Sequence, residues 1–310
     1  MQAQASLPGR RRGGAHRLTR EAVIESLVRV SGLSAILFVV LVFLFLAREG
    51  VPAIFEVSPG NLLGPRWYPT FGIYGILPLL AGSLLVTVGA LIISVPLGVA
   101  TAVFMRELAP SWLREVLKPL IEVLAGIPSV VLGFLGMVAV APLLRQHLGM
   151  PTGLSAFAGS LTLAYMALPT IITVSDDAID AVPKGYRDAS LALGANRWQT
   201  IWGVVVPAAR SGIIVGVMLG VGRAIGETMV VLMVTGNAAR MPDGPAALFQ
   251  PVRTMTATIA AEMGEVANGS THYHVLFAVG IALFLITFLV NLLASVLVLR
   301  RGGRSDQLLG

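Results

Sequence analysis

Six long apolar stretches limit the fold of this chain more than any other feature of its sequence. Each is long enough, at roughly 20 residues, to cross a hydrocarbon core of about 30 Å as a helix. We place them at Leu27–Ala47, Ile76–Met105, Pro119–Leu144, Leu154–Ser175, Ala208–Thr235 and His274–Leu299. A helix also satisfies its own backbone hydrogen bonds, which lipid cannot do. The sequence therefore predicts an all-α integral membrane protein with six transmembrane helices.

Composition supports a membrane protein and argues against two other classes. Only 12% of the residues are charged, whereas soluble domains average about 25%. The net charge of +6 does not indicate a nucleic-acid-binding protein, because the basic residues flank the apolar stretches instead of forming one face. The chain contains no cysteine, so a disulfide framework and a thiolate metal site are both excluded.

The distribution of Lys and Arg predicts the orientation in the membrane. Basic residues are concentrated in the amino-terminal tail, Arg106–Lys118, Lys184–Arg210 and Arg300–Arg304. The alternate loops carry fewer, namely Arg48, Arg66, Arg145, Arg240 and Arg253. Because cytoplasmic loops are enriched in Lys and Arg, we expect both termini and the loop at 183–207 in the cytoplasm.

The spans also suggest the domain organisation. We expect a basic cytoplasmic tail at residues 1–26, with no cleaved signal peptide. The tail would be disordered or would contain a surface helix through Leu18–Val30. A first span with an outward loop would follow at 27–75. A five-helix core at 76–300 would contain the loop 183–207, and a short cytoplasmic tail would follow at 301–310.

The loop Pro183–Pro207 has the local chemistry of two short helices. Pro183 suits the start of the first helix, and Gly194 suits the left-handed position that ends it. Asn196 can cap the second helix. Ala189 and Ser190 leave little side-chain bulk on the first helix, which suits insertion into a groove of another protein. An ordinary connection between helices is the alternative.

Arg223 and Glu227 are two charged residues in the fifth apolar stretch. Their spacing of four places them on one helical face within reach of each other. Charged groups at this depth cost about 2.5–3.5 kcal/mol on insertion scales and usually face a bundle interior or an aqueous path. Arg suits an oxyanion because its planar guanidinium can donate to two oxygens. A purely structural ion pair is the alternative.

Glycine and proline also have predicted roles within the membrane. Gly216, Gly220, Gly222 and Gly226 would let a neighbouring helix pack closely on the fifth span. Gly126 and Pro128 can break or kink the third span. Glu122, which precedes them, would either pair with a loop cation or contribute to a gate.

The outward loops offer weaker signals. Trp67, Tyr68, Phe71 and Tyr74 would form an interfacial aromatic belt or part of a docking surface. A short helix is expected around Thr254–Met263. His272 and His274 have the spacing of metal ligands, but without a nearby carboxylate or thiolate in sequence we favour a position at the level of the lipid headgroups.

The cytoplasmic loop resembles that of binding-protein-dependent ABC importer permeases. Their pattern is E-A-A, three residues, G, nine residues and I-x-L-P. Here it reads Asp188-Ala189-Ser190, Gly194, and then Val204, Val206 and Pro207, with every interval kept. The resemblance implies the type I permease fold and makes Tyr186, Asp188, Ala189, Ser190 and Gly194 the residues that couple to an ATPase.

Two further stretches are similar to the PstC type of phosphate importer permease. They are GRAIGETMVVLMVTGNA, from Gly222, and Leu124-Ala125-Gly126-Ile127-Pro128-Ser129. His272-Tyr273-His274 adds to the likeness, which covers most of residues 76–300. It implies that Arg223, Glu227 and Thr228 belong to a phosphate pathway, with Glu122, Gly126, Pro128 and Ser129 as gate or packing residues.

The resemblance also implies a location in a bacterial inner membrane and several partners. The partners are a second, PstA-like permease subunit, two PstB-like ATP-binding subunits and an extracytoplasmic, PstS-like phosphate-binding protein, together with membrane lipid. ATP and Mg would be bound by the partners, since no cofactor is expected in this chain, which would not be an enzyme by itself. A permease for molybdate or sulfate is the nearest alternative. A gradient-driven transporter, or a membrane sensor or scaffold, are alternatives from other classes.

Overall fold

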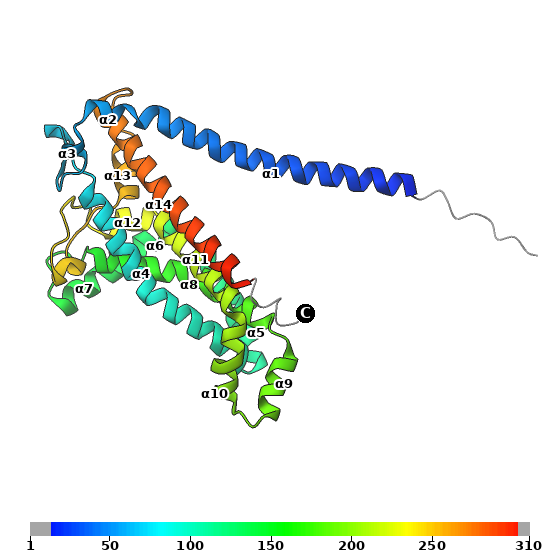
Figure 1. The fold of residues 1–310 in the computed structure, drawn as a ribbon. Helices are drawn as coiled ribbons and strands as arrows, with labels where there is room; N and C mark the ends of the chain where they lie inside the picture. The colour runs from blue at the N-terminus through cyan, green and yellow to red at the C-terminus, as the bar shows by residue number, and fades with distance from the viewer. Residues whose placement is uncertain (1–13, 303–310) are drawn as a thin grey trace, which may run out of the picture. The chain divides into compact units, whose positions relative to one another are not determined.

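The computed structural model describes residues 14–302 of the chain (Figure 1). It divides into two units, the first ending at Arg48 and the second beginning at Glu49. The long apolar helix α1 (Gly14–Gly50) accounts for the described part of the first unit. Helix α1 begins at Gly14, so residues 14–26 of the predicted basic tail at 1–26 are helical. Residues 1–13 and the tail residues 303–310 lie outside the described part.

Within residues 14–302, six helices are long and apolar enough to cross a membrane, which confirms the predicted fold class. The first of them begins at Val23 in α1. The other five lie in the second unit and are built from α4 (Leu77–Val103) with η2 (Phe104–Leu108), α6 (Ser129–Leu135) with η3 (Gly136–Val140) and α7 (Ala141–Leu148), α8 (Ala156–Asp180), α10 (Arg197–Thr200) with η4 (Ile201–Val205) and α11 (Val206–Gly226), and α14 (Thr271–Gly302). The segments η2, η3 and η4 are single π-helical turns.

The third span starts later than predicted. Residues Ser111–Ala125 form a separate amphipathic helix, α5, and the chain leaves the helical path at Gly126 before α6 begins at Ser129. Pro128 causes this break, because proline has no N–H to donate and disfavours helical backbone at the preceding residue. The predicted helix from Pro119 to Leu144 is therefore two helices.

Helix α8 is the centre of the second unit. In its most apolar window 61% of the residues are buried, against 28% or less in the other candidate spans. It packs between α4 and α11 (Figure 1). Ile171 of α8 fills the space beside Gly98 of α4 and Gly220 of α11, where an added Cβ would come within 2.7 Å of the Ile171 side chain. These glycines let three helices approach closely.

The predicted packing role of the four glycines in α11 is confirmed for two of them. Gly216 lies against Val174 and Ser175, and Gly220 lies against Ile171. An added Cβ at Gly222 would meet one atom, at 4.0 Å, and an added Cβ at Gly226 would meet none within 4 Å. The close approach therefore involves only the part of α11 that packs on α8.

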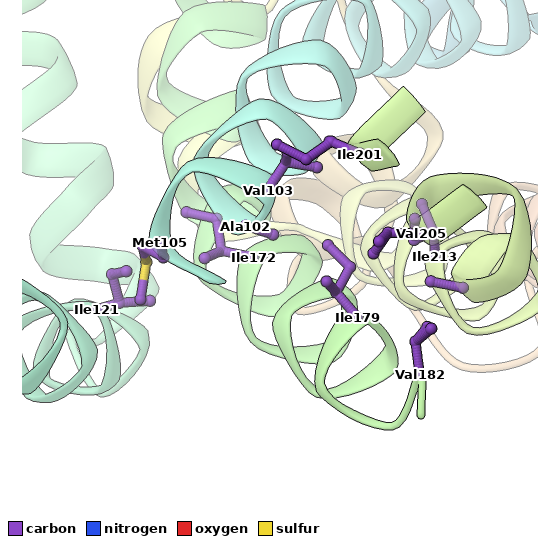
Figure 2. Packing of buried hydrophobic residues seen from close by; sticks show 11 residues of the cluster. Ala102, Val103, Met105, Ile121, Ile172, Ile179, Val182, Ile201, Val205 and Ile213 are labelled. Atoms are coloured by element: carbon purple, nitrogen blue, oxygen red, sulfur yellow. The ribbon is translucent and has the colours of Figure 1, made fainter. Parts of the chain in front are cut away.

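A cluster of buried apolar residues joins α4, η2, α5, α8, η4 and α11 near the loop of α9 (Lys184–Ala192) and α10 (Figure 2). Its members include Met105, Ile121, Ile179, Ile201 and Val205. These residues come from segments far apart in sequence. The cluster therefore holds together the ends of the helices that adjoin the α9–α10 loop.

The segment before α4 contains α2 (Pro52–Glu56), α3 (Pro59–Leu62), the 3₁₀ turn η1 (Pro69–Phe71), and strands β1 (Trp67–Tyr68) and β2 (Ile73–Tyr74), which pair antiparallel. Trp67 and Tyr74 are buried and meet edge to face, with ring centroids 6.1 Å apart. The predicted aromatic belt is wrong for these two residues, whereas Tyr68 and Phe71 are exposed. Burial raises the pKa of the Tyr74 hydroxyl, and the nearby Glu56 carboxylate adds to this.

The segment between the fifth and sixth spans contains three short helices, α12 (Met229–Val234), the 3₁₀ helix η5 (Pro245–Phe249) and α13 (Met255–Glu262). The Thr254 hydroxyl accepts a hydrogen bond from the Ala257 N–H and caps α13. The short helix expected around Thr254–Met263 is thus confirmed. Its first turn is buried, so α13 is part of the packed body.

Candidate functional site

Arg223 lies in the last turn of α11 and faces α8. Its Nη1 donates a hydrogen bond of 3.3 Å to the Thr170 hydroxyl of α8. The described residues supply no ion pair for this guanidinium, and its surroundings leave it partly exposed. Thr170 is not among the predicted site residues, because it lies 53 positions from Arg223 in the sequence. A single threonine in an apolar stretch does not by itself indicate a binding site.

Glu227 is not on one helical face with Arg223, which corrects the prediction from their spacing. Helix α11 ends at Gly226, and Glu227 has extended backbone with φ −70° and ψ 131°. Its carboxylate Oε1 accepts from the N–H groups of Met229 and Val230, at 3.0 and 3.2 Å. Among the described residues, neither hydrogen bonds nor ion pairs join Arg223 to Glu227.

The Glu227 backbone is held by the neighbouring helix α13. Its carbonyl accepts a 3.0 Å hydrogen bond from the Thr256 hydroxyl, and the residue is 9% exposed. A carboxylate at this position satisfies the free N–H groups that begin α12 and complements the positive end of that helix. Thr228, the next residue, donates to the Gly226 carbonyl at 3.4 Å. The predicted fifth span to Thr235 is therefore α11, an extended residue and α12.

The breaks in the third and fifth spans are neighbours in space. Helix α6, which follows Pro128, packs against α12, which follows Glu227. An added Cβ at Gly133 of α6 would lie 3.2 Å from the Met229 carbonyl oxygen. Interrupted helices of this kind occur within membranes where the free backbone lines a cavity or is buried in protein. Gly126 and Pro128 thus lie at the break, as predicted, and Ser129 begins the helix that follows. Their role as gate or packing residues stays a prediction.

Glu122 lies on the exposed side of α5. The ion pairs of the described residues do not include it, so the expected pairing with a loop cation of the same chain is not found. A contribution to a gate stays a prediction.

The loop 183–207 has the two predicted helices. Gly194 follows α9 with φ +90°, the Gly194 N–H donates to the Leu191 carbonyl, and the Ala195 N–H donates to the Ser190 carbonyl. This pair of bonds is the Schellman motif. Asn196 and Gln199 form a capping box at the start of α10. Pro183 stands one position before the first helical residue.

The same loop presents an exposed apolar surface. Tyr186, Leu193 and Trp198 are exposed, Leu193 to 90%. Asp188 and Ala189 are exposed as well, and Ser190 is half-buried with its hydroxyl 3.0 Å from that of Thr200. Large exposed apolar side chains gathered in one place are typical of a protein interface.

The two histidines each meet a carboxylate from another segment. His272 Nε2 lies 2.8 Å from Glu262 Oε2, and His274 Nδ1 lies 2.7 Å from Glu56 Oε1. Nearby carboxylates were not expected from sequence. The described residues nevertheless contain no group of three or more His, Cys, Asp or Glu able to hold a metal ion.

Comparison with known proteins gives matches over most of the chain. Residues 94–302 match the family model "binding-protein-dependent transport system inner membrane component". The "probable ABC transporter permease protein YqgH" of Bacillus subtilis is 42% identical over 267 residues, covering 84% of this chain and 85% of that protein. The "phosphate transport system permease protein PstC" of Mesorhizobium japonicum is 34% identical over 309 residues, covering 94% of this chain and 90% of that protein.

Solved structures show likeness in fold. A subunit of a bacterial ABC transporter involved in alginate import has a TM-score of 0.62 at 15% identity, covering 92% of this chain and 99% of that one. A subunit of the MetNI methionine ABC transporter has a TM-score of 0.54 at 20% identity, covering 78% of this chain and 97% of that one.

Proposed function

The chain belongs to the family of binding-protein-dependent transport system inner membrane components, and we propose that it is the phosphate-conducting permease subunit of an ATP-driven importer. The fold and the family make it a membrane-spanning ABC importer permease. The choice of phosphate goes further and rests on a separate observation. Several relatives named PstC, for example at 36% and 32% identity over most of the chain, are called phosphate transport proteins.

The site is chemically suited to an oxyanion. Arg223 keeps donors available beyond the one that meets Thr170, because a guanidinium carries five N–H groups. A tetrahedral phosphate can accept two of them from one planar fork. Glu227, in contrast, has one oxygen committed to the start of α12, so we assign it to shaping the break beside Arg223.

Transport would need other chains. We assign a second permease subunit, two ATP-binding subunits that bind ATP and Mg, and an extracytoplasmic phosphate-binding protein. The exposed surface of α9 and α10 would receive the ATPase subunits. The excess of Lys and Arg around this loop supports a cytoplasmic position for it and for both termini. Closure of the ATPase pair would move α9 and thereby the broken helices.

The decisive experiment is ATP-dependent uptake of labelled phosphate into vesicles that hold this chain with its candidate partners. We expect uptake that Arg223→Ala abolishes and that excess molybdate or sulfate leaves unchanged. Arg145→Ala is the matched control, because Arg145 is exposed at the end of α7. Uptake of another oxyanion would overturn the substrate but keep the architecture. An assembled complex without any ATP-dependent flux would favour a sensor.

A further inference from the structure

Arg187 is a half-buried residue of α9 that joins three elements. Its Nε and Nη2 donate to Glu107 Oε1 of η2, at 3.1 and 2.7 Å. Its Nη1 donates to the Val182 carbonyl and its Nη2 to the Ile179 carbonyl, at 2.6 and 3.0 Å. The same side chain therefore ties α9 both to the end of the second span and to the carboxyl-terminal end of α8.

The link is polar because α9 has little apolar packing of its own. None of its residues is buried, and none belongs to the cluster of Figure 2. The side chains of Arg187 and Glu107 are only 19% and 13% exposed, by contrast. A paired charge in such a place is costly to break, since the remaining partner would stay partly desolvated without its counter-charge.

Further bonds extend the link into the membrane body. Arg106, next to Glu107, donates from Nε and Nη2 to both oxygens of Asp176 in α8, at 3.0 and 2.8 Å. Arg114 of α5 donates to the carbonyls of Met105 and Arg106, at 2.8 and 2.6 Å. Helix α5 leads directly into the break at Gly126, and α8 carries the Thr170 that meets Arg223.

We propose that the Arg187–Glu107 pair is the mechanical linkage that transmits movement of α9 to the second span, α5 and α8. This proposal rests on the proposed function, in which ATPase subunits move α9. The two residues are positioning residues that do not touch the transported ion. Loss of the pair would let α9 move without carrying the spans, so ATP would be hydrolysed without matching transport.

The test measures phosphate imported and ATP hydrolysed in the same vesicles. We expect Arg187→Ala and Glu107→Ala each to lower the phosphate imported per ATP at least about fivefold, the lower end of typical coupling between sites. The double variant should be no worse than Arg187→Ala, since that variant already removes the pair with Glu107. Arg187→Lys keeps the charge but loses the planar pair of donors. Its phosphate imported per ATP should lie between the wild-type and Arg187→Ala values.

Lys118→Ala is the control, because the Lys118–Asp177 pair also joins α5 to α8 but is 3.9 Å long and exposed. Its ratio should stay at the wild-type value. A merely structural role would lower the amount of assembled complex while the ratio in the remainder stayed unchanged, and that result would overturn the linkage.

Replacement variants and a second transported ion allow the linkage to be tested independently of the proposed substrate. Glu107→Gln and Arg187→Lys replace the alanine variants if those fail to assemble, and an unchanged ratio in both would again overturn the proposal. If the wild-type complex imports another oxyanion, the proposed substrate fails, and the same ratio measured with that ion still decides the linkage.

Discussion

Arg223 and Glu227 share one stretch of sequence but have different environments. The Arg223 guanidinium meets only the Thr170 hydroxyl among the side chains of the described residues, whereas the Glu227 carboxylate is bonded to backbone N–H groups. Their opposite charges and their spacing of four would predict an ion pair between them. The local backbone separates them, because α11 ends between them. The side chain that stays available to a ligand is Arg223.

Arg223→Lys tests whether the fork or only the charge is needed. An ammonium on a flexible stem lacks the planar pair of donors, so we expect phosphate uptake to fall by roughly tenfold or more, the loss of one charge-assisted hydrogen bond of about 1.5–3 kcal/mol. Uptake at several phosphate concentrations measures this. Arg145→Lys makes the same exchange at an exposed position and should behave as wild type. Equal uptake by both variants would make Arg223 structural.

At the scale of elements, α9 is a short helix whose end depends on backbone geometry. An added Cβ at Gly194 would meet no atom within 4 Å, so side-chain crowding does not explain why glycine stands there. Its φ of +90° does, because this region is strained for residues with a Cβ. Gly185, inside the same helix, also has open space but an ordinary helical backbone.

The same substitution at these two glycines should have opposite effects. Gly194→Ala should destabilise the end of α9 by about 1–2 kcal/mol, whereas Gly185→Ala should stabilise the helix slightly. Hydrogen exchange of the α9 amides would show this as about 5–30-fold faster exchange for Gly194→Ala and equal or slower exchange for Gly185→Ala. If exchange is equal in the two variants, the left-handed cap does not hold the helix end.

At the scale of the whole molecule, the predicted orientation assigns the two ends of the second unit to different compartments. The natural chain has no cysteine, so each introduced cysteine is the only one present. Gly60 in α3 and Gly185 in α9 are exposed, and an added Cβ would meet no atom at either. They serve as matched labelling positions on the outward segment and on the coupling loop.

Labelling with a membrane-impermeant maleimide tests the orientation. In intact cells stripped of the outer membrane, we expect Gly60→Cys to react and Gly185→Cys to stay unlabelled until the membrane is opened. The excess of Lys and Arg around α9 is the physical reason for this expectation. The reverse pattern would place the loop outside and separate it from ATP, which would contradict the proposed mechanism.

The sequence by itself determined those features that depend on neighbours along the chain. The six spans follow from local hydropathy, and the α9–α10 loop follows from Pro183, Gly194 and Asn196, whose turn and capping preferences act within a few residues. Pro128 also predicts the break before Ser129, but it does not by itself show that the residues before the break form the separate helix α5.

Tertiary structure decided the features that depend on distant partners. Thr256 of α13 holds the extended Glu227, Glu262 receives the indole N–H of the buried Trp67, and Glu107 meets Arg187 from 80 positions away. A helical spacing can place two side chains on one face only while the helix continues. Whether it continues at Gly226 depends on packing between α12, α13 and α6, which brings together segments that no local pattern connects.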